Sequence, residues 1–309
     1  MPMLGGNGRG LCAALASAPC LGATLFGVTP TSIVRFDSAD PAAQTEIGPH
    51  GLPASQFAFL LTYNRADGYL YGRRSEPAPG STFDYMLYRF DPATGAGELV
   101  SNLGNTGVIG QLGFFEYADT LGRIVVSRGN GAVRHELWTI DEDGALEFLV
   151  DTGRDHIAAA FDSRRGAMYT VSAGSPRMAT VDLATGAVGP LNVVVAVNEM
   201  AYVACEDSFY GRTSVGVLHS IQTTNGEGPI SNTNLGFLGS GFGGIAAIPD
   251  GSCGPDLDCS GDVGFTDLNI LLGQYGKAWP GIHGDLDGDG DVDFGDLNLL
   301  LSAYSAACE

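Results

Sequence analysis

The chain has 309 residues and a formal net charge of −20 at pH 7. Residues 253–309 contribute eleven acids against Lys277, which is half of that charge, −10. A chain of this length can bury a large core. An acidic chain without clustered cations is unsuited to nucleic acid, because phosphate binding needs such clusters.

The N-terminus is apolar from Leu11 to Val28, with Arg9 the only charge before it. This resembles a secretory signal peptide, cleaved after Ala23 to leave a mature chain from Thr24. The alternative is a start codon assigned too far upstream. Apart from this stretch, no segment reaches the roughly 18 apolar residues that a transmembrane helix needs, so the mature chain is expected to be secreted.

A repeated unit follows, consisting of an apolar strand, a polar turn with Gly, and a strand that ends in an aromatic or apolar residue. Alternating apolar residues, β-branched and aromatic enrichment, and Gly/Asp turns are typical of antiparallel strands. The four copies span residues 59–72, 113–126, 158–169 and 200–211.

A second recurring strand ends in Asp, or in Gln in the last copy. It occurs at residues 33–37, 87–91, 137–141, 178–182 and 218–222, spaced by roughly 40 to 54 residues, close to the length of a propeller blade. Five copies predict a five-bladed β-propeller over residues 24–250. The first copy lacks an inner strand, and Gly243–Ile248 has the inner-strand pattern, so the chain's end is expected to complete blade one and close the ring. A β-sandwich is the rival fold.

Arginines are expected on one face of this propeller. Each predicted loop between second and third strands, at 72–84, 127–136, 172–177 and 211–216, contains Arg. Because guanidinium groups bind carboxylate and sulfate in a bidentate manner, an anionic ligand such as an acidic polysaccharide is one hypothesis; loop decoration for solubility is the other. The candidate ligand-binding residues are Arg73, Arg74, Arg128, Arg134, Arg177 and Arg212.

Catalysis is the less favoured interpretation of the propeller. A glycosidase needs convergent carboxylates, and Glu116, Asp155 and Glu199 lie on or beside the inner strands of three different blades. We expect these acids to be solvated or paired with Arg, and the chain contains no metalloprotease or serine-hydrolase motif.

The last fifty-five residues contain a calcium-loop pattern twice, beginning at Asp256 and at Asp285. An EF-type loop supplies oxygens from positions 1, 3, 5, 7, 9 and 12, with Gly at position 6. The second loop has Asp at position 9, whereas the first has Gly264 and is expected to bind more weakly. We predict two Ca²⁺ ions, held by Asp256, Asp258, Ser260, Asp262, Asp267, Asp285, Asp287, Asp289, Asp291, Asp293 and Asp296.

Two such loops, 29 residues apart and each followed by an apolar helical run, resemble a bacterial type I dockerin. The resemblance covers residues 253–308 and extends to Asp at position 12. It implies a small α-helical, non-catalytic module that docks onto a cohesin-like or other cell-surface protein. Cys253 and Cys308 bracket the module, as in a dockerin variant whose ends are joined by a disulfide; Cys205 and Cys259 either pair or stay free.

The sequence therefore predicts a signal peptide at 1–23, a propeller at 24–250 and a dockerin-like calcium-binding module at 251–309. The expected function is a secreted, non-catalytic binding or scaffold protein of a bacterial surface, with a polysaccharide or a surface protein as the propeller's ligand. The alternative is a polysaccharide-degrading hydrolase carried on a dockerin.

Overall fold

The computed structural model describes residues 24–52, 60–79, 82–105, 111–129, 135–141, 143–172, 177–189, 192–204, 206–224, 227–239, 242–248, 254–257, 262–278, 282–287 and 289–306. The predicted signal peptide lies outside these residues. So do all six cysteines, including the predicted Cys253–Cys308 pair. Within the described part, no helix is both long and apolar enough to cross a membrane.

Five four-stranded antiparallel sheets form a five-bladed β-propeller, as the repeat predicted. Blade 1 consists of β20 (Ile245–Ala247), β1 (Thr24–Val28), β2 (Ser32–Asp37) and β3 (Asp40–Pro49). Blade 2 consists of β4 (Leu60–Asn64), β5 (Tyr69–Ala78), β6 (Thr82–Phe90) and β7 (Gly97–Asn105). Blade 3 consists of β8 (Gln111–Ala118), β9 (Arg123–Gly129), β10 (Glu136–Ile140) and β11 (Leu146–Asp151), with a 3₁₀ turn η1 (Asp119–Leu121) after β8.

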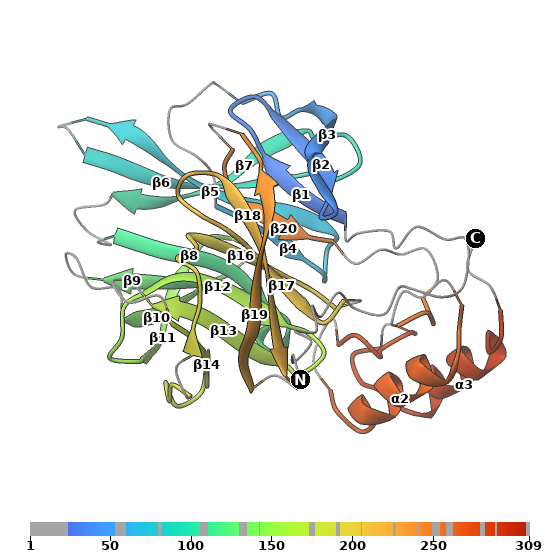
Figure 1. The fold of residues 1–309 in the computed structure, drawn as a ribbon. Coiled ribbons are helices and arrows are strands. Elements are labelled where there is room, and N and C mark those ends of the chain that lie inside the picture. Colours follow the sequence, from blue (N-terminus) through green and yellow to red (C-terminus); the bar gives the residue numbers. More distant parts are fainter. Residues whose placement is uncertain are drawn as a thin grey trace, which may run out of the picture.

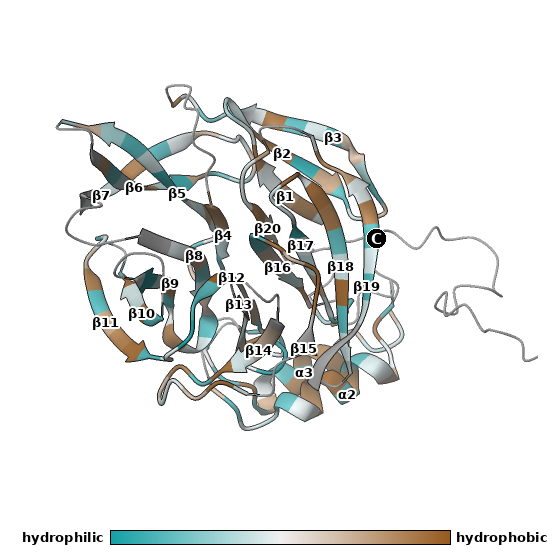
Figure 2. Cartoon of the chain, turned by 60° about the vertical axis from the view of Figure 1, so that its left-hand side comes forward, coloured by the Kyte–Doolittle hydropathy of each residue, from teal (hydrophilic) through white to brown (hydrophobic). Residues whose placement is uncertain are grey.

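Blade 4 consists of β12 (His156–Asp162), β13 (Ala167–Ser172), β14 (Arg177–Val181) and β15 (Asn192–Val193). Blade 5 consists of β16 (Glu199–Val203), β17 (Ser208–Arg212), β18 (Val217–Thr224) and β19 (Glu227–Phe237). Figure 2 shows the inner strands β20, β4, β8, β12 and β16 around the centre, with β3, β7, β11 and β19 at the rim.

The ring closes as the sequence predicted. The last propeller strand, β20, pairs antiparallel with the first, β1, through Leu25↔Ala247 and Gly27↔Ile245. Joining the two ends of the propeller chain in one sheet removes an exposed sheet edge. The N-terminal and C-terminal strands therefore support each other in blade 1.

The hydrophobic core is divided among the boundaries between blades. Five clusters of buried apolar residues each combine side chains from two neighbouring blades. One cluster, for example, places Tyr71 and Leu87 of blade 2 against Phe115 and Val126 of blade 3. Burial of apolar side chains stabilises such contacts by about 25 cal/mol per Å², so the blade boundaries are the main source of stability.

Two copies of an Asp-x-Ala-Thr-Gly turn join the third and fourth strands. The Asp91 carboxylate accepts the Ala93 N–H at 2.8 Å, and the Asp182 carboxylate accepts the Ala184 and Thr185 N–H groups at 2.9 Å. Gly95 and Gly186 have φ of +76° and +72°, a conformation that suits Gly. The Asp markers of the repeat are therefore turn-forming residues.

The C-terminal part contains two helices, α2 (Phe265–Gln274) and α3 (Phe294–Ser302). Figure 1 shows them lying together beside the propeller. Their core repeats at a 29-residue spacing, because Val263, Leu271 and Leu257 are matched by Val292, Leu300 and Leu286. The side chain of Gln274 links this part to the propeller, donating to the Arg164 carbonyl at 3.3 Å and accepting from Gly284 N–H at 2.6 Å.

Candidate functional site

The second predicted calcium loop brings carboxylates together. Among the described residues, two groups of three acids each have ligand atoms within 4.8 Å of one another, and both lie in this loop. The groups are Asp285, Asp287 and Asp289, and Asp291, Asp293 and Asp296. Hard cations such as Ca²⁺ and Mg²⁺ prefer oxygen ligands of this kind, so the loop has a donor set suited to a metal ion.

The loop is closed by hydrogen bonds from its own backbone. Asp296, which is fully buried, accepts from Leu286 N–H at 2.6 Å and from Asp293 N–H at 2.7 Å. Asp285 accepts from Gly290 N–H at 3.0 Å, and Gly290 has φ +98°. Burial and repulsion from neighbouring carboxylates raise the pKa of Asp287 and of Asp291. This concentration of negative charge is what a bound cation would relieve.

The first loop has the same framework where it is described. Gly264 N–H donates to the Asp267 carboxylate at 2.7 Å, which matches the contact between Asp293 and Asp296 in the second loop. Asp256 and Asp267 are buried, and Asp262 is exposed. The predicted ligands Asp258 and Ser260 lie outside the described residues, so this ligand set stays a prediction.

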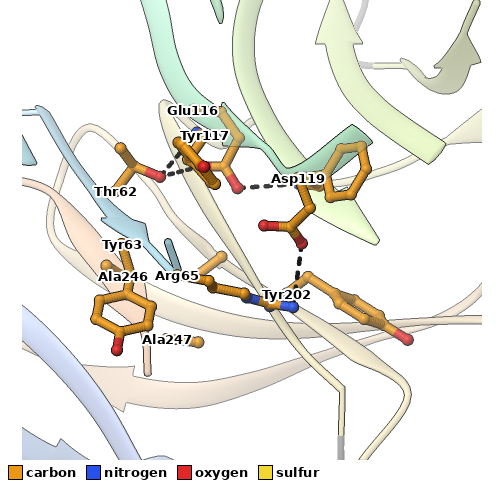
Figure 3. A pocket seen from close by; sticks show the side chains of 11 residues that line it. Thr62, Tyr63, Arg65, Glu116, Tyr117, Asp119, Tyr202, Ala246 and Ala247 are labelled. Atoms are coloured by element: carbon orange, nitrogen blue, oxygen red, sulfur yellow. Dashed lines mark hydrogen bonds and ion pairs between the residues drawn. The ribbon is translucent and has the colours of Figure 1, made fainter. Parts of the chain in front are cut away.

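A second polar site lies on the propeller axis (Figure 3). A cavity of about 20 Å³ is lined by Thr62, Glu116 and Tyr117, together with Arg65 and Asp119. The Arg65 guanidinium pairs with the Asp119 carboxylate at 3.1 Å. A cavity of this size has room for about one water molecule, which is far less than a sugar residue needs.

Glu116 joins three blades. Its carboxylate accepts from the Thr62 hydroxyl of blade 2 at 3.0 Å and from the Phe161 N–H of blade 4 at 2.9 Å. Complete burial raises the pKa of Glu116 to about 8, against the opposing effect of these two hydrogen bonds. At neutral pH the group is therefore mostly protonated and serves as an uncharged connector between blades.

Glu199 begins β16, the inner strand of blade 5, and Asp155 lies just before β12. Burial raises the pKa of Glu199 to about 8, although Arg212 and Arg73 act against this shift. Asp155 is partly buried. The inner strands run in the same direction, so Glu199, at the start of its strand, and Glu116, near the end of its own, lie toward opposite ends of the axis. The structure thus shows two buried carboxyl groups at different depths.

The arginines predicted to lie in loops are mostly within strands, which is a correction to the expected register. β5 continues to Ala78 and β6 begins at Thr82, so Arg73 and Arg74 are buried residues of β5. Backbone pairing between β5 and β6 runs on from Arg73↔Leu87 to Ala78↔Thr82, which continues the ladder where the sequence suggested a loop. Arg74 pairs with Glu76, and Arg73 lies over the Tyr85 ring at 4.7 Å.

The remaining candidates differ in position. Arg128 belongs to β9 and lies over the Trp138 ring at 4.4 Å, and Arg212, the last residue of β17, donates to the Thr213 carbonyl at 3.2 Å. Arg134 and the side chain of Arg177 lie outside the described residues. The arginines that the structure describes therefore contact other residues of the propeller. Their positions follow from the lengths of the paired strands, which the residue types alone did not indicate.

No protein-family model matches this chain, and no curated protein sequence matches it. Solved structures similar in fold include a chain of a nidogen/laminin complex, at 12% identity and a TM-score of 0.46, covering 74% of this chain and 99% of that one. A glucose dehydrogenase aligns at 13% identity and a TM-score of 0.43, covering 76% of this chain and 90% of that one. An oligogalacturonate lyase from Vibrio parahaemolyticus aligns at 12% identity and a TM-score of 0.35, covering 70% of this chain and 62% of that one.

Proposed function

We propose that this chain is a secreted scaffold protein, which a calcium-loaded, dockerin-like C-terminal module fixes to a protein of the bacterial surface. The observation that carries this proposal is a repeated apolar surface beside the two acidic loops. The propeller then has a non-catalytic binding or presenting role. We propose Ca²⁺ as the ion because both loops place oxygen donors at its ligand positions.

The repeated surface, here called the docking surface, consists of three pairs of exposed residues 29 positions apart. Phe265 and Phe294 are 69% and 62% exposed, Leu272 and Leu301 are both 49% exposed, and Tyr275 and Tyr304 are 47% and 42% exposed. Large apolar side chains gathered outside the core are typical of protein-binding surfaces. Their repetition supports a partner protein that meets either helix in a similar way.

Calcium would act on this surface through the loops. Phe265 and Phe294 are the first residues of α2 and α3, and each stands at position 10 of a predicted ligand loop. An ion in the second loop would be held by the Asp291 carbonyl and by the side chains of Asp285, Asp287, Asp289, Asp293 and Asp296, and would neutralise part of their charge. Loop closure would then fix the start of the helix, so calcium is expected to order the docking surface.

The hydrolase alternative has less support. The carboxylate of Glu116 is engaged by hydrogen bonds from two other blades, and the cavity beside it holds about 20 Å³. Asp155 lies just outside the inner strand β12 and is partly buried. An anionic polysaccharide as the propeller's ligand also has limited support, because Arg73, Arg74 and Arg128 lie in strands against aromatic rings.

The test is calorimetric titration of the chelator-treated full chain with Ca²⁺, followed by binding to a panel of immobilised cohesin modules. We expect calcium uptake and calcium-dependent binding. Asp285→Ala/Asp287→Ala should abolish uptake at the second loop, whereas the control Asp40→Ala, an exposed propeller acid, should not.

A second pair of variants separates docking from folding. Phe265→Ser/Phe294→Ser should keep calcium uptake but lose cohesin binding, and Phe237→Ser, which removes a 54% exposed phenylalanine from the propeller, should keep both. Absence of calcium uptake, or binding that persists in chelator, would contradict the proposal. Sugar release from polysaccharides that disappears in Glu116→Gln would favour the hydrolase instead.

A further inference from the structure

A cleft of about 460 Å³ lies between blades 2 and 3, at the end where first and second strands turn. Its size is in the range of small-ligand sites. Asn64 and Asp67 line it from blade 2, and Arg123, Asp141 and Asp143 line it from blade 3. The three aspartates and one arginine give it a formal charge of −2. The cleft is separate from the acidic loops and from the axial cavity, although Tyr117 lines both the cavity and the cleft.

The carboxylates of the cleft keep acceptor capacity. Asp67 accepts from the Tyr71 hydroxyl at 2.7 Å and from the Tyr69 N–H at 3.0 Å. Asp141 receives N–H groups from Asp143 and Ala145 on one oxygen only. A carboxylate offers about four lone-pair sites, so both can accept further hydrogen bonds. Among the described residues, no group of three acids here comes close enough to hold a metal ion.

Tyr117 provides the second observation. Its side chain is only 4% exposed, and its hydroxyl has no hydrogen-bond partner among the described residues. A buried hydroxyl without a partner costs about 1–3 kcal/mol. Such a group beside a polar cleft indicates a ligand that supplies the missing partner.

The boundary between blades 4 and 5 has the same framework with an occupant. Tyr117 pairs with Ile124 across its blade, and Tyr202 pairs with Phe209 in the same way. Counting along these turns, Asn64, Asp67 and Gly122 correspond to Asp162, Arg165 and Asp207. Gly122 and Asp207 both have left-handed backbone, with φ of 61° and 47°, which supports the correspondence.

At that boundary a guanidinium fills the space. Arg165 Nη1 donates to Asp162 and to Asp207 at 2.6 Å, and Nη2 donates to the second Asp207 oxygen at 2.6 Å. The Tyr202 hydroxyl donates to Asp207 at 2.8 Å. The tyrosine that corresponds to Tyr117 is therefore satisfied by the carboxylate that the guanidinium holds in place.

We propose that the cleft between blades 2 and 3 binds a guanidinium-bearing ligand, in the place that Arg165 occupies between blades 4 and 5. The guanidinium donates to Asp67 and Asp141, and a carbonyl beside it in the ligand accepts from Tyr117. The planar fork of five N–H donors matches carboxylates better than an ammonium does. This site is independent of calcium and of the docking surface.

The experiment titrates the full, calcium-loaded chain with Nα-acetyl-L-arginine amide by calorimetry. We expect saturable binding, at least tenfold weaker binding for the lysine analogue, and none for the citrulline analogue, which has the same shape without the charge. Tighter binding of Ac-Ala-Arg-Ala-NH₂ identifies a peptide as the source of the guanidinium, and equal binding identifies a small metabolite. Equal affinity for citrulline, binding of glucose or maltose instead, or no saturable binding would overturn the proposal.

Variants locate the site. Asp67→Asn should weaken arginine-amide binding at least tenfold, and Tyr117→Phe should weaken it about fivefold. Tyr63→Phe, which removes a hydroxyl from the axial cavity only, should leave it unchanged. The variant Asn64→Asp/Asp67→Arg/Gly122→Asp supplies the residues of the other boundary and should abolish binding in a folded protein. If that variant does not fold, Asp67→Asn and Asp143→Asn together decide, because each removes one negative charge from the lining of the cleft. Unaltered affinity in both would refute the site.

Discussion

The boundary between blades 2 and 3 and the boundary between blades 4 and 5 use one framework in two ways. Each places a buried tyrosine of an inner strand, Tyr117 or Tyr202, beside the turn of the preceding blade. Between blades 4 and 5 an arginine and two aspartates fill the space. Between blades 2 and 3 the turn carries Asp67, and a cleft remains. The two boundaries show that the same framework can either hold a guanidinium of the chain itself or leave a cleft.

The largest loss of stability is expected from Arg165→Ala, which removes the guanidinium from the boundary between blades 4 and 5. Arg165→Ala leaves the fully buried Asp162 carboxylate without its cation, and Asp207 loses its bidentate partner. Removing one member of a buried ion pair costs about 3–5 kcal/mol, and partial exposure of Arg165 and Asp207 favours the lower end. Urea unfolding followed by fluorescence measures this loss.

Arg123→Ala is the matched control at the open boundary. Arg123 pairs with Glu147 at 2.6 Å, and both side chains are exposed, so its removal should cost about 0–1 kcal/mol. Similar losses at the two positions would show that the Arg165 network stabilises its boundary no more than a surface ion pair does.

A smaller effect concerns pH and depends on Glu116 of blade 3, which is hydrogen-bonded to Thr62 of blade 2. The pKa of Glu116 is raised from 4.5 to about 8 by burial. Between these values the native state keeps the proton and the unfolded state has lost it, so stability falls as pH rises. The expected slope from this group is on the order of 1 kcal/mol per pH unit.

Glu116→Gln isolates this contribution. The amide is close in shape to the protonated acid and can still accept from Phe161 N–H and donate to the Thr62 hydroxyl. Unfolding free energies measured from pH 5 to pH 8 should therefore decline less steeply in the variant than in the original chain. A decline that is equally steep in both would mean that Glu116 is ionised in the native state.

The comparison also shows what the sequence can predict. Period-2 strands, Asp-Gly turns and the inner-strand pattern at Gly243–Ile248 were sufficient for the five blades and their closure, because these depend on local patterns that repeat. The carboxylate clusters at residues 285–296 were predicted for the same reason, since the acids of such a loop occupy fixed positions within twelve residues.

The cleft depends on pairings across blades, which no local pattern contains. In the sequence Asp67 is an ordinary turn residue, and only the structure shows that it corresponds to Arg165. Tyr117 is likewise an ordinary core aromatic in the sequence, and only the structure shows that its hydroxyl lacks a partner among the described residues. The arginine positions were misjudged for a related reason. Strand length in β5 and β6 is set by pairing between the strands, whereas the sequence was taken to show a loop from Gly72 onward.

The last comparison is between Tyr202→Phe and Tyr117→Phe. The first substitution should lower the free energy of unfolding, and the second should leave it equal or raise it. Tyr202→Phe removes a hydroxyl that donates to Asp207 at 2.8 Å, and loss of a hydrogen bond to a charged group costs about 1.5–3 kcal/mol, less where the charge is part-exposed. Tyr117→Phe removes a hydroxyl without a partner, so stability should stay equal or rise by up to about 1 kcal/mol. The same substitution at corresponding positions changes one atom in each case, which makes packing differences small. Urea unfolding at pH 7 without added ligand tests this, and a loss at Tyr117 as large as that at Tyr202 would mean that its hydroxyl is already bonded in the unliganded protein.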